Sequence, residues 1–172
     1  MEHTQKLLNY LLENQVKYQY LTHPECKTSK ESREARIKAG GDDVIGAKAL
    51  VIKMDRKGSG SEFNLLVLPG TRKLDSSVLK QYFKAEIKSF RFATTEELAD
   101  LTEGLVPGSI PPFAHPIFDT LNHLFVDSAL LDHEKIGFNA ASLTQSLIIH
   151  TQDYLKLAQP THIFAFSVHQ EE

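Results

Sequence analysis

Residues 104–116 constrain the fold more than any other segment. They contain four prolines and two glycines in thirteen positions, and proline lacks the backbone N–H that helices and strand ladders need. We therefore expect a long rigid loop. Fixed prolines and apolar residues are unusual in an ordinary surface loop, and loops of this kind often carry function. The alternative is a rigid connector that packs Phe113 into the core.

Apolar periodicity and turn residues predict the regular elements on both sides of this loop. The expected helices are residues 3–14, 28–40, 75–83, 94–104 and 151–158. The expected strands are residues 17–22, 47–54, 63–68, 87–92, 123–126, 135–139, 146–150 and 162–168. Hairpin-length connections occur among them, which favours a mixed or mostly antiparallel sheet over a doubly wound parallel one.

Four helix starts carry capping signals, and one of them is Asp75, which we expect to cap the helix at residues 75–83. Thr28 with Glu31, and Thr94 with Glu97, have the spacing of a capping box. In such a box the hydroxyl and the carboxylate each accept a hydrogen bond from an N–H that the first helical turn leaves unpaired. We expect Thr151 to cap the last helix.

Composition indicates one folded domain over residues 1–172. The chain is 41% apolar and 24% charged, with a formal net charge of −3. These values are ordinary for a globular protein and exclude a uniformly basic nucleic-acid coat. No segment approaches the roughly 18 consecutive apolar residues of a membrane span. A single cysteine and the lack of a secretion signal lead us to expect a cytoplasmic protein.

The net charge hides an uneven distribution. Residues 1–95 hold 17 basic and 11 acidic side chains, whereas residues 96–172 hold 2 and 11. A basic half is suited to contact a nucleic-acid backbone, in a contact that weakens as salt rises. The alternative is a solvated face on which acids are interleaved with the bases. The candidate contacts are Lys27, Lys30, Arg33, Arg36, Lys53 and Arg56.

Lys48 is a candidate for chemistry because it interrupts an otherwise apolar strand. A charge on the inner face is costly without a partner, and buried lysines are often functional. The alternative is a stem that lies on apolar surface and keeps the ammonium in water. Cys26 has no adjacent base, and we interpret it as inert. One cysteine and no closely spaced histidine pair predict no metal site.

Residues in and after the loop complete the candidate set. Glycines such as Gly108 let a backbone N–H point at a ligand oxygen, as an oxyanion site requires. His115 has the chemistry of a general base, although a partly exposed histidine with no role is an equal reading. Asn139 and Ser142 are suited to line a polar pocket or to form turns.

A series of short motifs occurs in a defined order. The motifs are His23-Pro24, Thr28-Ser-Lys-Glu31, Gly46-Ala-Lys48-Ala-Leu, Val67-Leu-Pro-Gly70 with Leu74-Asp75, Ala93-Thr-Thr-Glu-Glu97, Val106-Pro-Gly-Ser-Ile-Pro-Pro-Phe113, Val126-Asp-Ser-Ala-Leu-Leu131 and Phe138-Asn-Ala-Ala-Ser142. Together they resemble the YbaK/prolyl-tRNA-synthetase-associated editing domains over about residues 17–165. Each motif is weak alone, but the ordered set is specific.

The resemblance implies a single-domain α+β fold with a mixed, mostly antiparallel, partly barrel-like sheet flanked by helices. It also implies a free-standing deacylase, without cofactor, that hydrolyses the ester of a mischarged aminoacyl-tRNA. The expected amino acid is small, such as Ser, Thr, Ala or Cys, and a synthetase is a compatible partner. A competing hypothesis is a catalytically silent tRNA- or aminoacyl-binding module that serves as a synthetase accessory.

The resemblance also implies roles for individual residues. Lys48 matches the strand lysine at the family's substrate pocket, and Gly108 and Pro112 match its Gly-x-x-x-Pro loop, whose backbone holds the aminoacyl group. Family members use no dedicated nucleophile, and hydroxyls of the terminal ribose assist the attacking water. This agrees with the absence of a convincing Ser/His/Asp set here. The further expected substrate contacts are Ser109, Ile110, Pro111, Phe113, His115, Asn139 and Ser142.

Some positions depart from the family pattern. Ala114 and Ala141 stand where many relatives have glycine, and we expect their methyl groups to narrow the pocket or to alter the approach of the loop. Asn139 stands where the alanine-editing branch has histidine. Serine or threonine is therefore the expected substrate amino acid.

Overall fold

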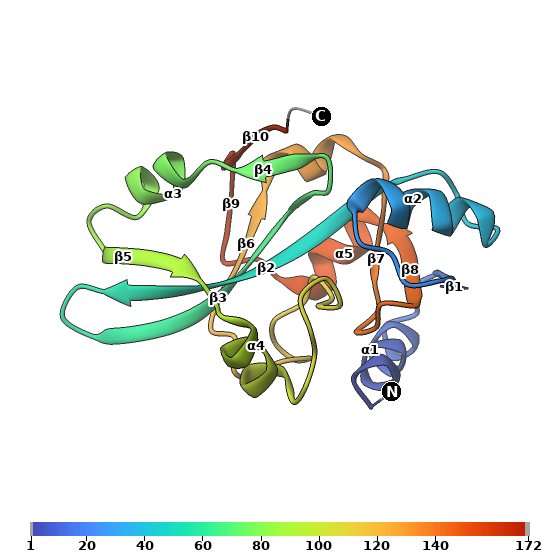
Figure 1. Ribbon diagram of the computed structural model, residues 1–172, viewed down its shortest axis with the longest axis horizontal. Helices are drawn as coiled ribbons and strands as arrows, with labels where there is room; N and C mark the ends of the chain where they lie inside the picture. Colours follow the sequence, from blue (N-terminus) through green and yellow to red (C-terminus); the bar gives the residue numbers. More distant parts are fainter. Residues whose placement is uncertain (1, 171–172) are drawn as a thin grey trace.

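The computed structural model describes residues 2–170 as a large mixed sheet with helices packed against it (Figure 1). The helices are α1 (Glu2–Glu13), α2 (Ser29–Lys38), α3 (Ser76–Tyr82), α4 (Thr95–Thr102) and α5 (Thr151–Ala158), with a short 3-10 helix, η1 (Ser128–Asp132). The strands are β1 (Gln19–Thr22), β2 (Ile45–Arg56), β3 (Gly60–Pro69), β4 (Arg72–Leu74), β5 (Ile87–Phe92), β6 (Leu124–Asp127), β7 (Lys135–Asn139), β8 (Gln145–His150), β9 (His162–Phe164) and β10 (Ser167–His169). The predicted helices are all present.

The main sheet is mixed. Its strands follow the order β1-β8-β7-β2-β3-β6-β9, and β5 also pairs with β2. The β1–β8, β7–β8, β2–β3 and β2–β5 ladders are antiparallel, whereas the β2–β7, β3–β6 and β6–β9 ladders are parallel. The expected mixed, mostly antiparallel α+β fold is therefore confirmed.

Strand β2 joins the two parts of this sheet because it changes neighbours along its length. Ile45 and Gly46 pair with β7, whereas residues 52–56 pair with β5. On its other side β2 pairs with β3 from Ala47 to Arg56. Residues 47–50 therefore have a strand partner on one side only. Figure 1 shows β2 running from beside α2 to the hairpin tip, with β7 and β5 at opposite ends.

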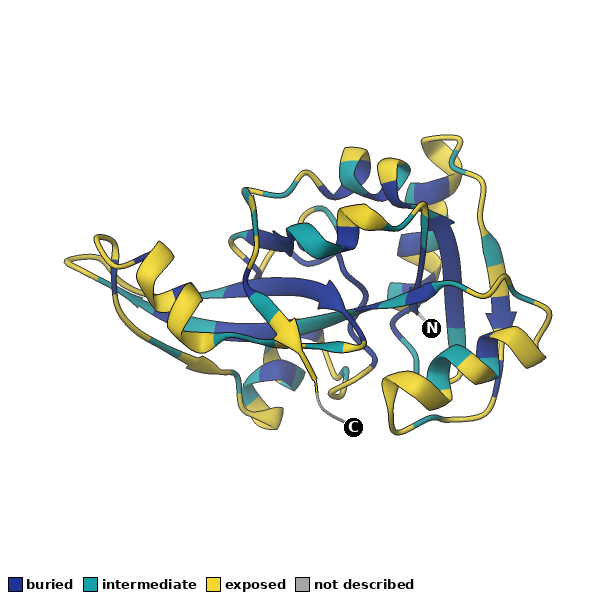
Figure 2. Cartoon of the chain, turned by 90° about the horizontal axis from the view of Figure 1, so that it is seen from above, coloured by how far each residue is buried: buried dark blue, intermediate teal, exposed yellow. Residues whose placement is uncertain are grey.

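The sheet carries a hydrophobic core on each face. In β3, Leu65 and Val67 belong to the larger core, whereas Leu66 and Leu68 belong to the smaller one under α3. Neighbouring residues of a strand point to opposite faces, so a strand covered on both faces is continuously apolar. Figure 2 shows this burial along the central strands and exposed residues at the hairpin tip.

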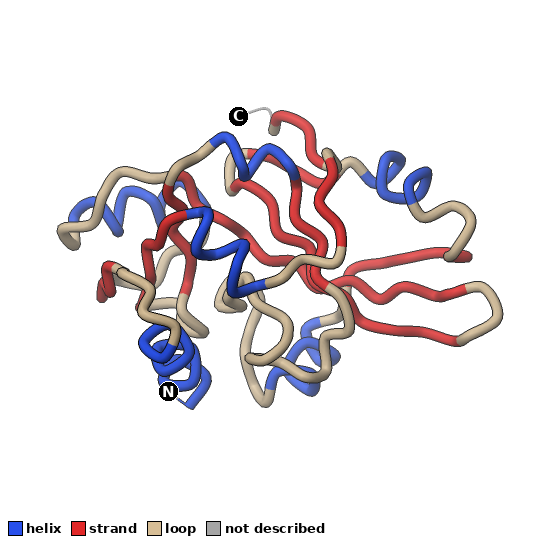
Figure 3. The backbone as a smooth tube through the Cα atoms, turned by 180° about the vertical axis from the view of Figure 1, so that it is seen from behind, coloured by secondary structure: helices blue, strands red, loops and turns tan. Residues whose placement is uncertain are grey.

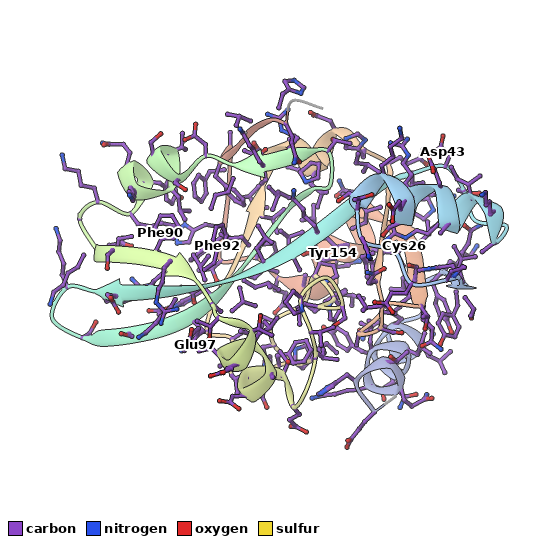
Figure 4. All side chains as sticks on the ribbon, viewed as in Figure 1. Cys26, Asp43, Phe90, Phe92, Glu97 and Tyr154 are labelled. Carbon is purple, nitrogen blue, oxygen red and sulfur yellow. The ribbon has the colours of Figure 1, made fainter. Side chains whose placement is uncertain are left out.

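The predicted rigid loop forms the middle of a longer connection, residues 103–123, which we call the α4–β6 loop (Figure 3). Phe113 is fully buried and makes edge contacts with the rings of Tyr10, Phe138 and Tyr154. The Tyr154 hydroxyl donates a 2.6 Å hydrogen bond to the carbonyl of Pro112, and Figure 4 shows this tyrosine beside the loop. The core therefore holds the loop rigidly against the sheet.

The capping predictions are confirmed in part. Thr94 and Glu97 form a complete capping box. Thr28 accepts a hydrogen bond from the N–H of Glu31, but the Glu31 carboxylate accepts from the N–H of Lys27 instead of the cap residue. The box predicted at Thr28 and Glu31 is therefore only half formed.

Two predictions near the C-terminus were wrong. Thr151 is the first residue of α5 and not its cap, because its hydroxyl donates to the carbonyl of His133. The predicted strand 162–168 is divided: β9 pairs with β6 and β10 pairs with β4. Between them Phe166 turns into the smaller core, and its N–H donates to the buried Asp127 carboxylate.

Within residues 2–170, no helix has the length and apolarity to cross a membrane.

Candidate active site

A pocket of about 200 Å³ opens beside the segment of β2 that has a partner on one side only. The chain before α2, the first turns of α2, the β2 segment, the α4–β6 loop and the end of β7 contribute to its wall. The lining residues are Cys26, Lys27, Thr28, Ser29, Ser32, Arg36, Gly46, Ala47, Lys48, Ala49, Leu50, Gly70, Gly108, Ile110 and Asn139. Within residues 2–170, the wall contains basic side chains and no carboxylate.

Part of the β2 segment at residues 47–50, which has a strand partner on one side only, points its peptide groups toward the pocket. The carbonyl of Gly46 accepts from Gly70 on the β3 side, and the carbonyl of Val51 accepts from Ala93 on the opposite side. Because the amide groups of successive strand residues alternate in direction, Ala47 and Ala49 direct their N–H and C=O groups away from β3. The parallel pairing of Gly46 with Gly137 engages the N–H of Ala47, whereas no strand pairs with Ala49 on this side. Ala49 lines the pocket, so a ligand there meets its backbone N–H and C=O.

Lys48 is half-buried in the pocket wall. Within residues 2–170, no carboxylate forms an ion pair with its ammonium. Burial lowers the pKa of this lysine below its ordinary value, because the charged form loses hydration. A cation without a protein partner at a pocket wall is suited to stabilise negative charge on a ligand.

The α4–β6 loop reaches the pocket at Gly108 and Ile110. Gly108 has a φ of +88°, in the left-handed region that glycine adopts without strain. Its carbonyl accepts a 2.6 Å hydrogen bond from Nδ2 of Asn139. Lys48, Gly108, Ile110 and Asn139, predicted from three separate parts of the sequence, therefore meet at one pocket.

A buried polar network supports Asn139 from behind. Ser146 in β8 lies with its Oγ 3.1 Å from Oδ1 of Asn139 and 2.7 Å from Nε2 of His23. Nε of Arg36 donates a 3.0 Å hydrogen bond to the same Oγ. The sequence reasoning missed Ser146 and gave His23 no role. The available signal was a serine at an inward position of an apolar strand.

Several predicted substrate contacts lie outside the pocket wall. Ser109, Pro111, Pro112 and Phe113 are buried behind it, where they fix the course of the loop. Ser109 bonds to the backbone of Val106. The alternative interpretation of the loop was that it packs Phe113 into the core. The loop does this, and it also contributes Gly108 and Ile110 to the pocket wall.

Two further predicted contacts are local. The side chain of His115 is 80% exposed and lies 2.8 Å from Asp119, while the Ser142 hydroxyl accepts from the N–H of Thr144 in a turn. Neither residue lines the pocket. The turn interpretation of Ser142 therefore fits the structure better than a pocket role.

A groove of about 750 Å³ adjoins the pocket and shares Lys27 and Lys48 with it. Lys30 and Arg33 also line the groove, and Arg33 pairs with Asp43 at 2.7 Å. Among the residues that the structure describes, no carboxylate lines this groove. Because the groove is positively charged, it is suited to bind a polyanion that extends toward the pocket.

The other predicted RNA contacts lie elsewhere. Arg36 is only 5% exposed and faces the sheet, which corrects the expectation that it contacts the RNA backbone. Arg56 pairs with Glu62 and Glu86 near the hairpin tip. Lys53 lines neither the pocket nor the groove.

In the described part of the chain, no group of three or more His, Cys, Asp or Glu side chains is placed to hold a metal ion.

Comparison with known proteins assigns the chain to a family. The family model described as the aminoacyl-tRNA editing domain matches residues 23–157. The chain belongs to the aminoacyl-tRNA editing domain family. Every residue that lines the pocket lies within the matched segment of the editing domain. The resemblance inferred from the ordered motifs is confirmed.

Relatives of this editing domain include a curated protein and solved structures. The chain is 35% identical over 159 residues to the multifunctional Ser/Thr-tRNA deacylase ProXp-y of Escherichia coli strain K12, covering 91% of this chain and 88% of that protein. Its fold is similar to that of a hypothetical protein, with a TM-score of 0.74, 20% identity, and coverage of 95% and 99% of the two chains. It is also similar to a candidate trans-editing enzyme for prolyl-tRNA synthetase, with a TM-score of 0.72, 18% identity and 99% coverage of both chains. The structural matches establish the editing-domain fold.

The alanines that depart from the family pattern leave the pocket wall of the editing domain unchanged. Ala141 has a φ of +59°, in the left-handed region that explains glycine in the more common motif. Ala114 is buried beside Phe113 in the larger core. Neither methyl group lines the pocket. The expected narrowing of the pocket is therefore absent.

Proposed function

We propose that this protein is a trans-editing deacylase that hydrolyses the ester of mischarged aminoacyl-tRNA, and that residues 1–172 act as one editing domain. The observation that supports this most strongly is the half-buried Lys48 at the pocket wall. Within residues 2–170, its ammonium has no carboxylate partner and no acidic side chain lines the pocket. Family membership and the relative named as a Ser/Thr-tRNA deacylase support the same activity.

The proposed reaction uses the electrostatics of the pocket. Water attacks the ester carbonyl carbon, and negative charge develops on the carbonyl oxygen. The C=O bond then re-forms as the bond to the ribose oxygen breaks, and the proton lost by the water passes to that oxygen, which releases the free amino acid and the tRNA. Lys48 stabilises the developing charge, and backbone N–H groups of the α4–β6 loop and of β2 are suited to assist it. No side-chain nucleophile is required. The family resemblance assigns help in activating the water to a hydroxyl of the terminal ribose.

A panel of aminoacyl-tRNAs tests this function. Purified protein is incubated with tRNAs that carry serine, threonine, alanine or cysteine, and release of each free amino acid is measured. We expect release of serine or threonine above the rate without protein. Binding of tRNA with no release from any member would favour the alternative, a silent binding module associated with a synthetase.

The groove is proposed to hold the 3′ end of the tRNA. We expect the Lys27→Ala/Lys30→Ala double variant to raise KM for aminoacyl-tRNA by about threefold to tenfold, because each exposed phosphate contact contributes modestly and is screened by salt. The increase should shrink at higher ionic strength, which steady-state kinetics at two salt concentrations measure.

Lys156→Ala is the matched control, since it removes a surface charge from α5, outside the groove. An equal change in KM for both proteins would contradict the assignment of the groove.

A further inference from the structure

Arg36 is a buried cation that lacks an acid. It lies on the inner face of α2, is 5% exposed, and forms no ion pair with a carboxylate within residues 2–170. Burial lowers the pKa of its guanidinium to about 10, which leaves it charged at neutral pH. Burying a charge without a counter-charge is unfavourable, so retaining arginine here requires a compensating role.

The sheet is built to admit this side chain. Gly46 of β2 and Gly137 of β7 are partners in the parallel ladder. A Cβ at Gly137 would lie 3.2 Å from Cδ of Arg36, and a Cβ at Gly46 would lie 3.4 Å from its Nη1. A larger residue at Gly137 would crowd the stem of Arg36, whereas a methyl group at Gly46 would only just reach contact with Nη1. Two glycines from distant parts of the chain thus leave a passage for one arginine.

The guanidinium keeps one nitrogen free for a ligand. Nε donates to Ser146 at 3.0 Å, and Nη2 makes a long 3.4 Å contact with Oδ1 of Asn139. Nη1 has no hydrogen-bond acceptor within residues 2–170 and lies next to Gly46, a pocket-lining residue, as Arg36 itself is. Two bonds therefore fix the plane of the guanidinium, while Nη1 is left without a protein acceptor within residues 2–170, beside a residue of the pocket wall.

The position of Arg36 within the pocket indicates which part of the substrate it meets. Lys48 lines both the outer groove and the pocket, whereas Arg36 and Asn139 line the pocket alone. A tRNA end that enters through the groove places its ester beside Lys48 and its amino-acid side chain farther in. A guanidinium there favours an oxygen acceptor and disfavours a cation or a purely alkyl group.

We propose that Arg36 is a specificity-determining residue, whose Nη1 donates a hydrogen bond to the side-chain hydroxyl oxygen of a seryl or threonyl group. The inference rests on the proposed deacylase function and deepens it by naming the residue that reads the amino acid. A pocket that hydrogen-bonds a substrate hydroxyl discriminates against the analogue without it far better than an apolar pocket does.

The test compares one tRNA charged with serine or with alanine. Arg36→Met keeps an unbranched stem as far as the position of Nε and removes all of the donors. We expect the ratio of kcat/KM for seryl over alanyl substrate to fall about 10- to 100-fold in this variant, the value of one charge-assisted hydrogen bond. A purely structural arginine would lower both rates alike. An unchanged ratio would therefore overturn the proposal.

A second variant keeps the charge if Arg36→Met fails to fold. Gly137→Ala places a Cβ 3.2 Å from Cδ of Arg36, which shifts the side chain by a few tenths of an ångström without removing it, and Gly137 does not line the pocket. We expect a smaller fall in the same ratio, with a circular-dichroism spectrum like that of the unmodified protein. No fall in the ratio for a folded Gly137→Ala would also count against the role of Arg36.

A binding measurement separates this inference from the deacylase proposal. Non-hydrolysable 3′-amide analogues of seryl-adenosine and alanyl-adenosine are titrated into the unmodified protein by calorimetry. We expect tighter binding of the seryl analogue, and loss of that preference in Arg36→Met. Equal affinities in the unmodified protein would overturn the role of Arg36 even if deacylation is observed. Absence of release from every aminoacyl-tRNA, with the seryl preference intact, would overturn the deacylase proposal alone.

Discussion

Lys48→Met is expected to lower kcat/KM for aminoacyl-tRNA hydrolysis by about 100- to 1,000-fold, the usual cost of removing one group that stabilises an oxyanion. Methionine matches the length of the lysine stem and suits a half-buried position in β2. The variant should therefore fold, because the change relieves the burial of a charge without a partner. Single-turnover release of the amino acid measures the effect.

The matched control is Lys88→Met, which changes an exposed lysine on β5 outside the pocket and the groove. We expect this protein to hydrolyse the substrate at the unmodified rate. A Lys48→Met variant that folds and turns over at more than a tenth of that rate would remove Lys48 from the mechanism.

Phe113→Ala is expected to lower the free energy of unfolding by about 3 to 5 kcal/mol, as large-to-small changes at buried aromatic residues do. The ring is fully buried against three other aromatic rings, and collapse around the cavity is hindered by the stiff prolines on either side. Urea denaturation measures the loss. We also expect weaker hydrolysis, since the ring anchors the loop that carries Gly108.

Phe92→Ala provides the comparison for this prediction. Phe92 is 52% exposed at the end of β5, so its loss should change the free energy of unfolding by less than about 1 kcal/mol. If the two variants were destabilised equally, the loop would not be anchored by Phe113.

The sequence predicted helices, hairpins and loops well where they depend on interactions between residues that are close together in the chain. The Thr94–Glu97 box, the hairpin of β2 and β3, and the loop with its prolines all follow from residues close together in the chain. The meeting of Lys48 with Gly108 was inferred only through the family resemblance, because no local pattern links residues so far apart.

The environment of Arg36 escaped prediction for the same reason. Helix α2 is strongly polar and carries few apolar residues, so periodicity does not reveal which side faces the sheet. The passage for the guanidinium depends on the register of Gly46 with Gly137, and parallel pairing between distant segments is not encoded by any short motif. The same holds for His23 and Ser146, which meet across the β1–β8 edge.

The one-sided segment of β2 also bears on self-association. A strand edge with free peptide groups is a template on which another chain can add a strand and begin aggregation. Here the free edge spans only residues 47–50 and is bounded by β7 at one end and β5 at the other. Strands in proteins commonly run to about five or six residues, so this recess is shorter than a typical added strand. The fold thereby keeps backbone groups available to a small ligand while limiting the ladder that a second polypeptide could form.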